Sequence, residues 1–204
     1  MFAVERLICL LTGYAFGCFL TGELVARRRT GAGADRLGTG NPGMANLAHE
    51  LGLGWGLLVL LGDVLKTALA CLIAWLLSGA ALGRLALLWT CLGAVLGHNF
   101  PFWQRFQGGK GVAVTCAGLI LYAPLWGTAA CLTGLGVTLA TGWLPLGAVV
   151  ITAVFLPLAC LFHGGEAGVL AAALTGLMVS RHYHGLGRIL RGEEPRKLRP
   201  GKSE

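Results

Sequence analysis

Three short polar segments hold the residues whose types and spacing could do chemistry. They are GTGNPGMAN at residues 38–46, GHNFPFWQRFQGGKGVAV at residues 97–114, and RHYHGLGRILRGEE at residues 181–194. Closely spaced glycines can turn backbone amides toward an anion, and the amino end of a helix attracts negative charge. Lys110 adds a full positive charge beside Gly108, Gly109 and Gly111. These patterns predict a site for phosphate groups.

The chain offers little for covalent catalysis. None of Ser78, Ser180 and Ser203 stands in the glycine-flanked setting of a nucleophile elbow, and no convincing Ser-His-Asp set can be assembled. The glycines around Lys110 do not form a Walker A loop, because neither Ser nor Thr follows the lysine. The residues therefore favour stabilisation of anions, as in direct transfer between two bound phosphorylated molecules.

The composition places these segments in a membrane protein. Hydrophobic residues make up 55% of the 204 residues and charged residues 12%, and the mean hydropathy is +0.72. All seven cysteines lie in apolar runs and none forms a CxxC pair, so we expect neither disulfides nor a metal site. The sequence shows no internal repeat and no soluble domain, which predicts a single membrane domain over residues 1–204.

The apolar runs predict an all-α, polytopic fold with about seven transmembrane helices, several of them short. Three runs cover residues 7–25, 51–77 and 85–96. A fourth apolar region extends from Lys110 to about residue 179, and breaks at Pro124, 141–145 and 163–166 divide it into four short spans. Five spans remain the alternative, if two of the short segments only dip into the membrane.

The basic residues predict the orientation. Thirteen of the sixteen Lys and Arg residues fall in the loop at 27–36, in the loop at 105–110, and in the basic tail from about residue 181. Because such residues gather on the cytoplasmic side, we expect the N-terminus outside and the C-terminus in the cytoplasm. Only Arg6 and Arg84 fall on the opposite side. The three polar segments would then meet at the cytoplasmic face.

Simpler interpretations exist for each feature. A basic loop beside a membrane span often only sets topology or contacts lipid headgroups. Asp63 and Lys66, one turn apart in the second run, either neutralise one another or form a functional pair within the membrane. The combination of all three polar segments on one face is what favours a phosphate site.

The three segments, in this order, resemble the motifs of the bacterial acyl-phosphate:glycerol-3-phosphate acyltransferases (PlsY type). The family's first motif reads approximately GSGNPGATN, the second GHxFPxF…FxGGKGVA and the third RHxxNIxRLxxGTE. The Asp63–Lys66 pair also looks like the family's second helix, and the resemblance covers the whole chain.

The resemblance implies a bacterial inner-membrane enzyme with its active site on the cytoplasmic side. The enzyme would move a fatty acyl group from acyl phosphate to the 1-hydroxyl of sn-glycerol 3-phosphate, giving lysophosphatidic acid and phosphate in phospholipid biosynthesis. It would need neither a cofactor nor a protein nucleophile. Expected partners are the two substrates, membrane lipids and the soluble enzyme that produces acyl phosphate; nucleic acid is not expected.

The resemblance also assigns residues. The implied catalytic residues are Thr39, Asn46, His98, Lys110 and His182. The implied substrate- and phosphate-binding residues are Gly38, Gly40, Asn41, Gly43, His49, Gly108, Gly109, Gly111, Arg188 and Glu194.

Four positions depart from the family pattern. Thr39 stands in place of Ser, Ala45 in place of Thr, His49 in place of Arg, and Gly185 in place of Asn. These departures keep open a divergent member with a changed acceptor or a non-catalytic lipid- or acyl-phosphate-binding role. An anion transporter is a further alternative, because glycine-broken helices and charged spans also occur in transporters.

Overall fold

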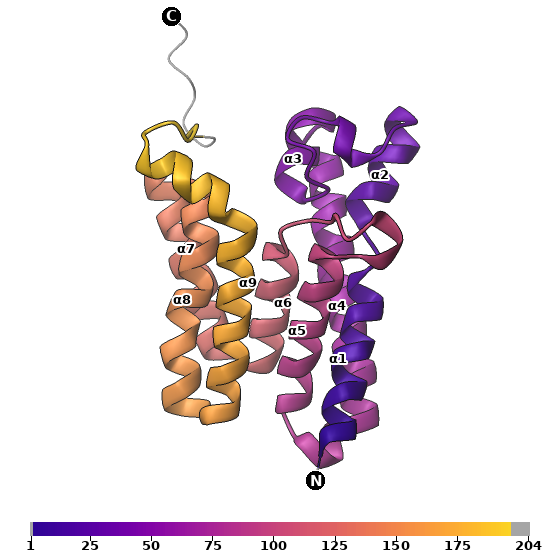
Figure 1. The fold of residues 1–204 in the computed structure, drawn as a ribbon, viewed down its shortest axis with the longest axis vertical. Coiled ribbons are helices and arrows are strands. Elements are labelled where there is room, and N and C mark those ends of the chain that lie inside the picture. Colours follow the sequence, from indigo (N-terminus) through magenta and orange to yellow (C-terminus); the bar gives the residue numbers. More distant parts are fainter. Residues whose placement is uncertain (1, 197–204) are drawn as a thin grey trace, which may run out of the picture. The chain divides into compact units, whose positions relative to one another are not determined.

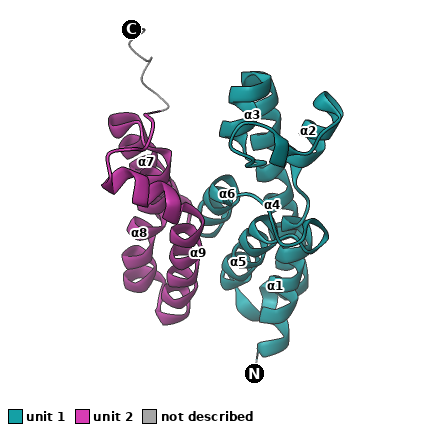
Figure 2. Ribbon diagram, turned by 45° about the horizontal axis from the view of Figure 1, so that its top comes forward, with its two compact units in different colours: residues 1–122 teal, residues 123–204 magenta. Residues whose placement is uncertain are grey.

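A computed structural model describes residues 2–196, which form an all-α protein (Figure 1). Lys197, Arg199 and Lys202 of the predicted basic tail lie outside the described residues. The chain divides into two compact units, Met1–Tyr122 and Ala123–Glu204 (Figure 2). The single domain over residues 1–204 stays a prediction.

The first unit has six α-helices in its described residues. They are α1 (Ala3–Gly17), α2 (Thr21–Thr30), α3 (Met44–Leu51), α4 (Leu53–Leu82), α5 (Leu85–Asn99) and α6 (Val112–Tyr122), with short 3-10 turns at Ala34–Arg36 and Phe102–Gln104. The long α4 packs against α1, α3, α5 and α6. Where α1 crosses α5, a Cβ on Gly13, Gly93 or Gly97 would overlap the backbone of the other helix. Small residues therefore let these two helices pack closely, as is common between membrane helices.

The second unit consists of three helices within its described residues, α7 (Pro124–Thr141), α8 (Leu144–His163) and α9 (Gly165–Leu190). α8 packs against both of the others. Gly142 and Gly164, with φ angles of 78° and 87°, make the two connections, because glycine adopts positive φ without steric cost. The helix breaks that the sequence predicts near residues 124, 141–145 and 163–166 are confirmed.

Four helical stretches among residues 2–196 are long and apolar enough to cross a membrane. They are Ala3–Thr30, Leu53–Leu82, Leu85–Gln104 and Leu144–His163. They confirm the class of membrane protein, while the count of about seven spans and the orientation of the termini stay predictions. The sequence analysis predicted one uninterrupted run at residues 7–25, whereas the helix breaks between α1 and α2, where Leu20 is extended.

Candidate active site

The break between α1 and α2 anchors the loop that follows α5. Trp103 donates from Nε1 to the carbonyl of Cys18 over 2.7 Å. Lys66, from α4, donates from Nζ to the carbonyl of Phe19 over 2.6 Å. Carbonyls freed by a helix break inside a membrane protein need such donors. The break between α1 and α2 thus supplies the carbonyl groups to which Trp103 and Lys66 are bonded.

The two loops of the first unit rest on this same part of the chain. We call residues 31–43 the first loop and residues 100–111 the second loop. The Pro42 carbonyl of the first loop lies against Gly22 so closely that a Cβ there would overlap it. In the second loop, the Phe100 carbonyl accepts a hydrogen bond of 2.9 Å from the Tyr14 hydroxyl of α1. Two of the three predicted segments are therefore held by neighbouring turns of α1 and α2.

Asn46, buried on α3, organises the first loop. Its Oδ1 accepts hydrogen bonds from the amide of Thr39 (2.9 Å) and from the Thr39 hydroxyl (3.1 Å). Its Nδ2 donates to the carbonyls of Leu37 (2.9 Å) and Asn41 (3.0 Å). These four bonds use the two donors and two acceptor positions of a carboxamide. Asn46 is thus placed to position the loop, and its part in catalysis stays a prediction.

Glycines give the first loop its sharp turns. Gly38 and Gly40 have φ angles of 49° and 72°, a region that other residues rarely adopt. A Cβ on Gly38 would also meet the side chains of Asn46 and Glu50. Gly43 stands at the N-cap of α3. The predicted glycines therefore shape the backbone around Thr39, whose side chain is exposed.

Glu23 is a buried residue of this region that the sequence analysis missed. Its Oε1 accepts a hydrogen bond of 2.6 Å from Arg27 Nε, and its Oε2 accepts one of 2.9 Å from the amide of Ala34. The carboxylate is 2% exposed, so it holds the start of the first loop against α2 from inside the protein. An acidic residue within the predicted apolar run 7–25 was the signal that could have identified it.

His49 lies at the outer edge of α3. Its side chain is exposed, and its Nδ1 lies 2.8 Å from Glu50 Oε1. A carboxylate beside the ring competes with a phosphate for the same imidazole. The predicted contact of His49 with phosphate stays a prediction.

The second loop folds back on the end of α5. The amide of Gly108 donates to the Asn99 carbonyl (3.1 Å), and the amide of Gly109 donates to the His98 carbonyl (2.9 Å). A Cβ on either glycine would overlap this part of α5. Close approach of two backbones is therefore one physical reason for the Gly108-Gly109 pair, and a contact of these amides with phosphate stays a prediction.

A buried polar cluster lies beneath this turn. Lys66 Nζ is 2.8 Å from Asp63 Oδ1 and 2.9 Å from His98 Nδ1, and none of the three residues is more than 5% exposed. The contacts of Lys66 are compatible with both interpretations of the Asp63–Lys66 pair that the sequence left open. The two charges compensate one another inside α4, and the ammonium also reaches the second polar segment.

The contacts of Lys66 define the protonation of His98. A lysine ammonium has donors and no acceptor, and its Nζ lies close to Asp63 Oδ1, to His98 Nδ1 and to the carbonyls of Phe19 and Gly17. Since Nδ1 accepts, the ring proton of the neutral imidazole is on Nε2. Nε2 is the atom that a Cβ on Gly109 would overlap most closely. His98 therefore presents a hydrogen-bond donor, rather than a base, toward the Gly108–Gly109 turn.

Lys110 stands between this turn and α6. Gly111, with a φ of 75°, makes the bend, and the amide of Thr115 donates to the Gly111 carbonyl over 2.9 Å. The amides of the first helical residues before Thr115 have no acceptor within the helix. A half-buried lysine beside a helix N-terminus is a combination that suits a phosphate dianion.

Asn99 adds a polar group to this region that the sequence analysis did not single out. Its side chain is fully buried and lies beneath Gly111. Neither its Oδ1 nor its Nδ2 has a hydrogen-bond partner among residues 2–196. Because buried carboxamides are normally bonded, Asn99 is a candidate site residue.

The third predicted segment lies in the second unit, at the end of α9. His182 is buried, and its Nδ1 lies 2.9 Å from the Met178 carbonyl, so Nδ1 carries a proton and donates. Arg188 Nε donates to Glu194 Oε2 over 2.6 Å. Arg188 and Glu194, each predicted to bind substrate or phosphate, form an ion pair with one another, which fixes the end of this segment.

Gly185, the departure in the third segment, has a packing role. A Cβ at this position would lie 2.6 Å from Cγ and 2.9 Å from Cβ of Pro145. The rigid proline ring cannot give way as a flexible side chain would, so α9 packs against the start of α8 only because residue 185 has no side chain.

Within residues 2–196, no three His, Cys, Asp or Glu side chains are grouped so that they could hold a metal ion.

Comparison with known proteins places this geometry in context. The sequence pattern of the family described as "Glycerol-3-phosphate acyltransferase" matches residues 7–192, a range that contains all three polar segments. The chain is 34% identical over 176 residues to glycerol-3-phosphate acyltransferase 1 of Lactobacillus johnsonii, covering 86% of this chain and 84% of the relative. It is 36% identical over 197 residues to the glycerol-3-phosphate acyltransferase of Anaeromyxobacter sp., covering 95% and 97%.

Solved structures agree with the sequence relatives. The fold is similar to that of PlsY (YgiH), an integral membrane glycerol 3-phosphate acyltransferase, in its glycerol 3-phosphate form. The TM-score is 0.83 at 28% identity, and the match covers 94% of each chain. The form of PlsY described as that with lysophosphatidic acid matches with a TM-score of 0.81.

Proposed function

Because the chain belongs to the glycerol-3-phosphate acyltransferase family, we propose that it transfers a fatty acyl group from an acyl phosphate to sn-glycerol 3-phosphate. It is a membrane acyltransferase, and glycerol 3-phosphate and lysophosphatidic acid are the ligands of the similar PlsY forms. The donor is the new part of the proposal. It is supported by one observation: Lys110 lies beside the N-terminus of α6, where a phosphate dianion is favoured.

The proposed reaction needs no covalent enzyme intermediate. The 1-hydroxyl oxygen of glycerol 3-phosphate attacks the acyl carbonyl carbon, and the bond from this carbon to the phosphate oxygen breaks. The hydroxyl proton passes to the departing phosphate, so that lysophosphatidic acid and inorganic phosphate result. The protein stabilises the charge on the phosphate, which suits a site rich in donors and without an activated nucleophile.

The roles of the residues follow from their contacts. Lys110 binds the phosphate of the donor, and His98 supplies its Nε2–H from below the turn at Gly109. Asp63 and Lys66 hold the His98 ring in the tautomer that donates from Nε2. They are positioning residues.

The first loop presents its own polar groups. Thr39 and Asn41 receive their positions from Asn46 and bind substrate phosphate or hydroxyl groups, together with the backbone of Gly38, Gly40 and Gly43. In the second unit, the proposed catalytic residue is His182 and the proposed substrate-binding residue is Arg188, whose guanidinium is fixed by Glu194.

We place the enzyme in the bacterial inner membrane, with about seven spans, an outside N-terminus and the polar segments on the cytoplasmic side. The distribution of Lys and Arg supports this orientation. The soluble enzyme that makes acyl phosphate is then a partner on the same side. Cysteine labelling from each side of a vesicle tests it: residues placed at 29 and 105 should react from one side and a residue at 84 from the other.

The donor is tested with purified protein and a panel of palmitoyl donors. We expect phosphate release and lysophosphatidic acid formation from palmitoyl phosphate only when glycerol 3-phosphate is present. Palmitoyl thioesters serve as the control donors. Transfer from a thioester at the same rate would refute an acyl phosphate donor, while the acyltransferase activity itself would still stand. Transfer to a different phosphorylated acceptor would show that His49 and Gly185 mark a changed acceptor.

A further inference from the structure

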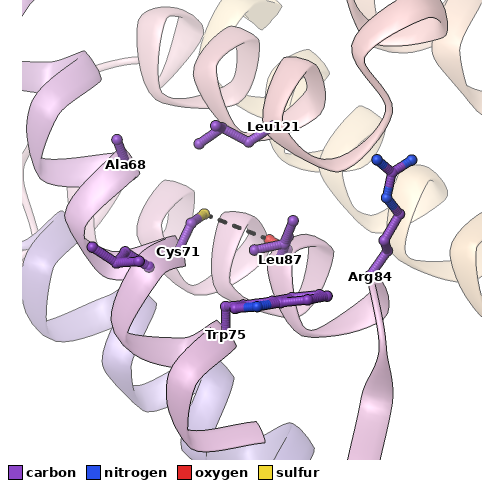
Figure 3. Close-up of a pocket in the computed structure, with 7 residues that line it drawn as sticks. Ala68, Cys71, Trp75, Arg84, Leu87 and Leu121 are labelled. Carbon is purple, nitrogen blue, oxygen red and sulfur yellow. Dashed lines mark hydrogen bonds between the residues drawn. The ribbon is translucent and has the colours of Figure 1, made fainter. Parts of the chain in front are cut away.

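A cavity of about 330 Å³ lies in the first unit, away from the two loops (Figure 3). One wall is a stripe of α4 that follows the i, i+3, i+4, i+7 pattern of one helix face: Ala68, Cys71, Leu72 and Trp75. Arg84 and Leu87, at the start of α5, form a second wall, and Leu121 in the last turn of α6 completes the lining. The volume is at the lower end of the roughly 300–1,000 Å³ of small-molecule pockets.

The cavity exists because α6 is short. α6 packs against α4 and α5, but its 11 residues rise only ~16 Å, whereas the 30 residues of α4 rise ~45 Å. Past Leu121 and Tyr122, α6 therefore no longer packs on the α4–α5 pair. Cys71, a buried residue near the middle of this stripe, contacts the other wall through a weak Sγ contact of 3.9 Å to the Leu87 carbonyl.

The lining is amphipathic in a particular way. Six of its seven residues are apolar or weakly polar, and the seventh, Arg84, carries a permanent charge. Figure 3 shows the Arg84 side chain at one edge of the cavity, across from Ala68. No ion pair joins Arg84 to another residue of the described chain, 2–196. The site thus combines an apolar groove with one cation that has no carboxylate partner there.

Arg84 also stands between two helical stretches that are each long and apolar enough to cross a membrane, Leu53–Leu82 and Leu85–Gln104. It is the N-cap residue of α5 and follows the turn at Gly83 that connects α4 with α5. Figure 1 shows this connection at the opposite end of α4 from α3. An arginine at the end of a membrane helix keeps its guanidinium at the interface, where lipid phosphates are. The partial positive charge at the N-terminus of α5 also attracts an anion to this position.

We propose that this cavity binds one anionic glycerophospholipid, with its phosphate at Arg84 and one acyl chain along the α4 stripe. The guanidinium forms charge-assisted hydrogen bonds with phosphate oxygens. Because no carboxylate pairs with Arg84 in the described chain, a net negative headgroup is preferred over a zwitterionic one, whose own cation offsets the attraction. The site is separate from the acyltransferase loops, so the proposal stands independently of the donor and acceptor.

Trp75 allows the proposal to be tested directly. The protein is reconstituted in phosphatidylcholine bilayers that contain an increasing fraction of phosphatidylglycerol with brominated acyl chains, which quench tryptophan fluorescence on contact. We expect a saturable component of quenching at low phosphatidylglycerol fraction, and its loss in the Trp75→Phe variant. Brominated phosphatidylcholine should give only quenching that rises in proportion to its fraction.

Variants of Arg84 and of Ala68 test separately the contribution of the charge and that of the apolar groove to lipid binding. Arg84→Gln should raise the phosphatidylglycerol fraction at half-saturation on the order of tenfold, as expected for loss of a hydrogen-bonded charge. Arg84→Lys should retain most of the binding. Ala68→Phe fills the groove and should abolish the saturable component while Arg84 remains. Arg6→Gln is the matched control, because Arg6 is the other arginine predicted on this side, and it should bind as the wild type does.

Acyltransferase activity shows that each variant is folded, since neither Arg84 nor Ala68 contributes to the catalytic loops. The proposal is overturned if wild-type quenching by phosphatidylglycerol is unsaturable or equals that by phosphatidylcholine, which would indicate annular lipid only. It is also overturned if Arg84→Gln binds with unchanged affinity. Displacement of the lipid by millimolar inorganic phosphate would show an anion site without a role for the acyl chain, and this too would contradict the proposal.

Discussion

Lys66 Nζ lies 2.9 Å from His98 Nδ1, and this contact joins the charged pair inside α4 to the glycine turn of the second loop. The ammonium is also bonded to Asp63 and to the Phe19 carbonyl at the break after α1. One buried side chain therefore connects three parts of the chain. The relationship makes the intramembrane charges part of the site.

We first expect Lys66→Met to lower both stability and activity. It leaves the Asp63 carboxylate buried without its partner, which typically costs about 3–5 kcal/mol. It also frees His98 to adopt the other tautomer. Thermal unfolding in detergent and turnover of palmitoyl phosphate measure the two effects.

The double variant Asp63→Leu/Lys66→Met separates them. Replacing both charges by apolar residues is often neutral for stability, so the unfolding midpoint should return toward the wild type. Activity should stay low, because His98 remains without its donor. Recovery of full activity in the double variant would show that the pair has only a structural role.

The second prediction concerns Lys110. We expect Lys110→Ala to reduce kcat/KM for palmitoyl phosphate by at least about tenfold, since a charged hydrogen bond contributes about 1.5–3 kcal/mol. Arg105→Ala is the matched control: Arg105 is in the same loop, is exposed, and should be active. If both variants keep wild-type kcat/KM, the basic residues of this loop serve topology only.

Much of the fold could be predicted from the sequence because hydrophobic length and glycine or proline breaks are local signals. The breaks at 124, 141–145 and 163–166 are confirmed, and the run at 85–96 corresponds to α5. The family was also predictable, because its three motifs are contiguous in sequence.

What could not be predicted depends on contacts between distant residues. The break at residues 18–20 has no proline, and it is stabilised by Trp103 and Lys66, which are 85 and 47 residues away from their acceptors. Apolar residues on both sides hide it from a hydropathy pattern. The part played by Glu23 depends on the Ala34 amide in the same way.

The third prediction tests Asn46 as the organiser of the first loop. Asn46→Asp keeps the acceptor for Thr39 but replaces the donor to the Leu37 and Asn41 carbonyls by an oxygen. We expect a higher KM for glycerol 3-phosphate, and a free energy of unfolding lowered by about 1–3 kcal/mol because the two carbonyls lose their donor. Ala45→Ser, at the neighbouring exposed position, should leave KM unchanged. An unaltered KM in Asn46→Asp would mean that the loop conformation does not determine acceptor binding.

The last prediction concerns Gly185, whose replacement of the family's asparagine could be read as a lost polar contact. The packing against Pro145 leads to the opposite expectation for stability. Gly185→Ala should destabilise the protein by about 1–3 kcal/mol, because the added methyl group overlaps a rigid ring. Gly176→Ala on the same helix is the matched control: a Cβ there meets nothing within 4 Å, so its better helix propensity should raise stability by up to about 1 kcal/mol.

Thermal unfolding of the two variants side by side measures the difference. Equal stability of both would show that α9 can move away from Pro145, and Gly185→Asn would then be a fair test of the missing side chain in acceptor binding.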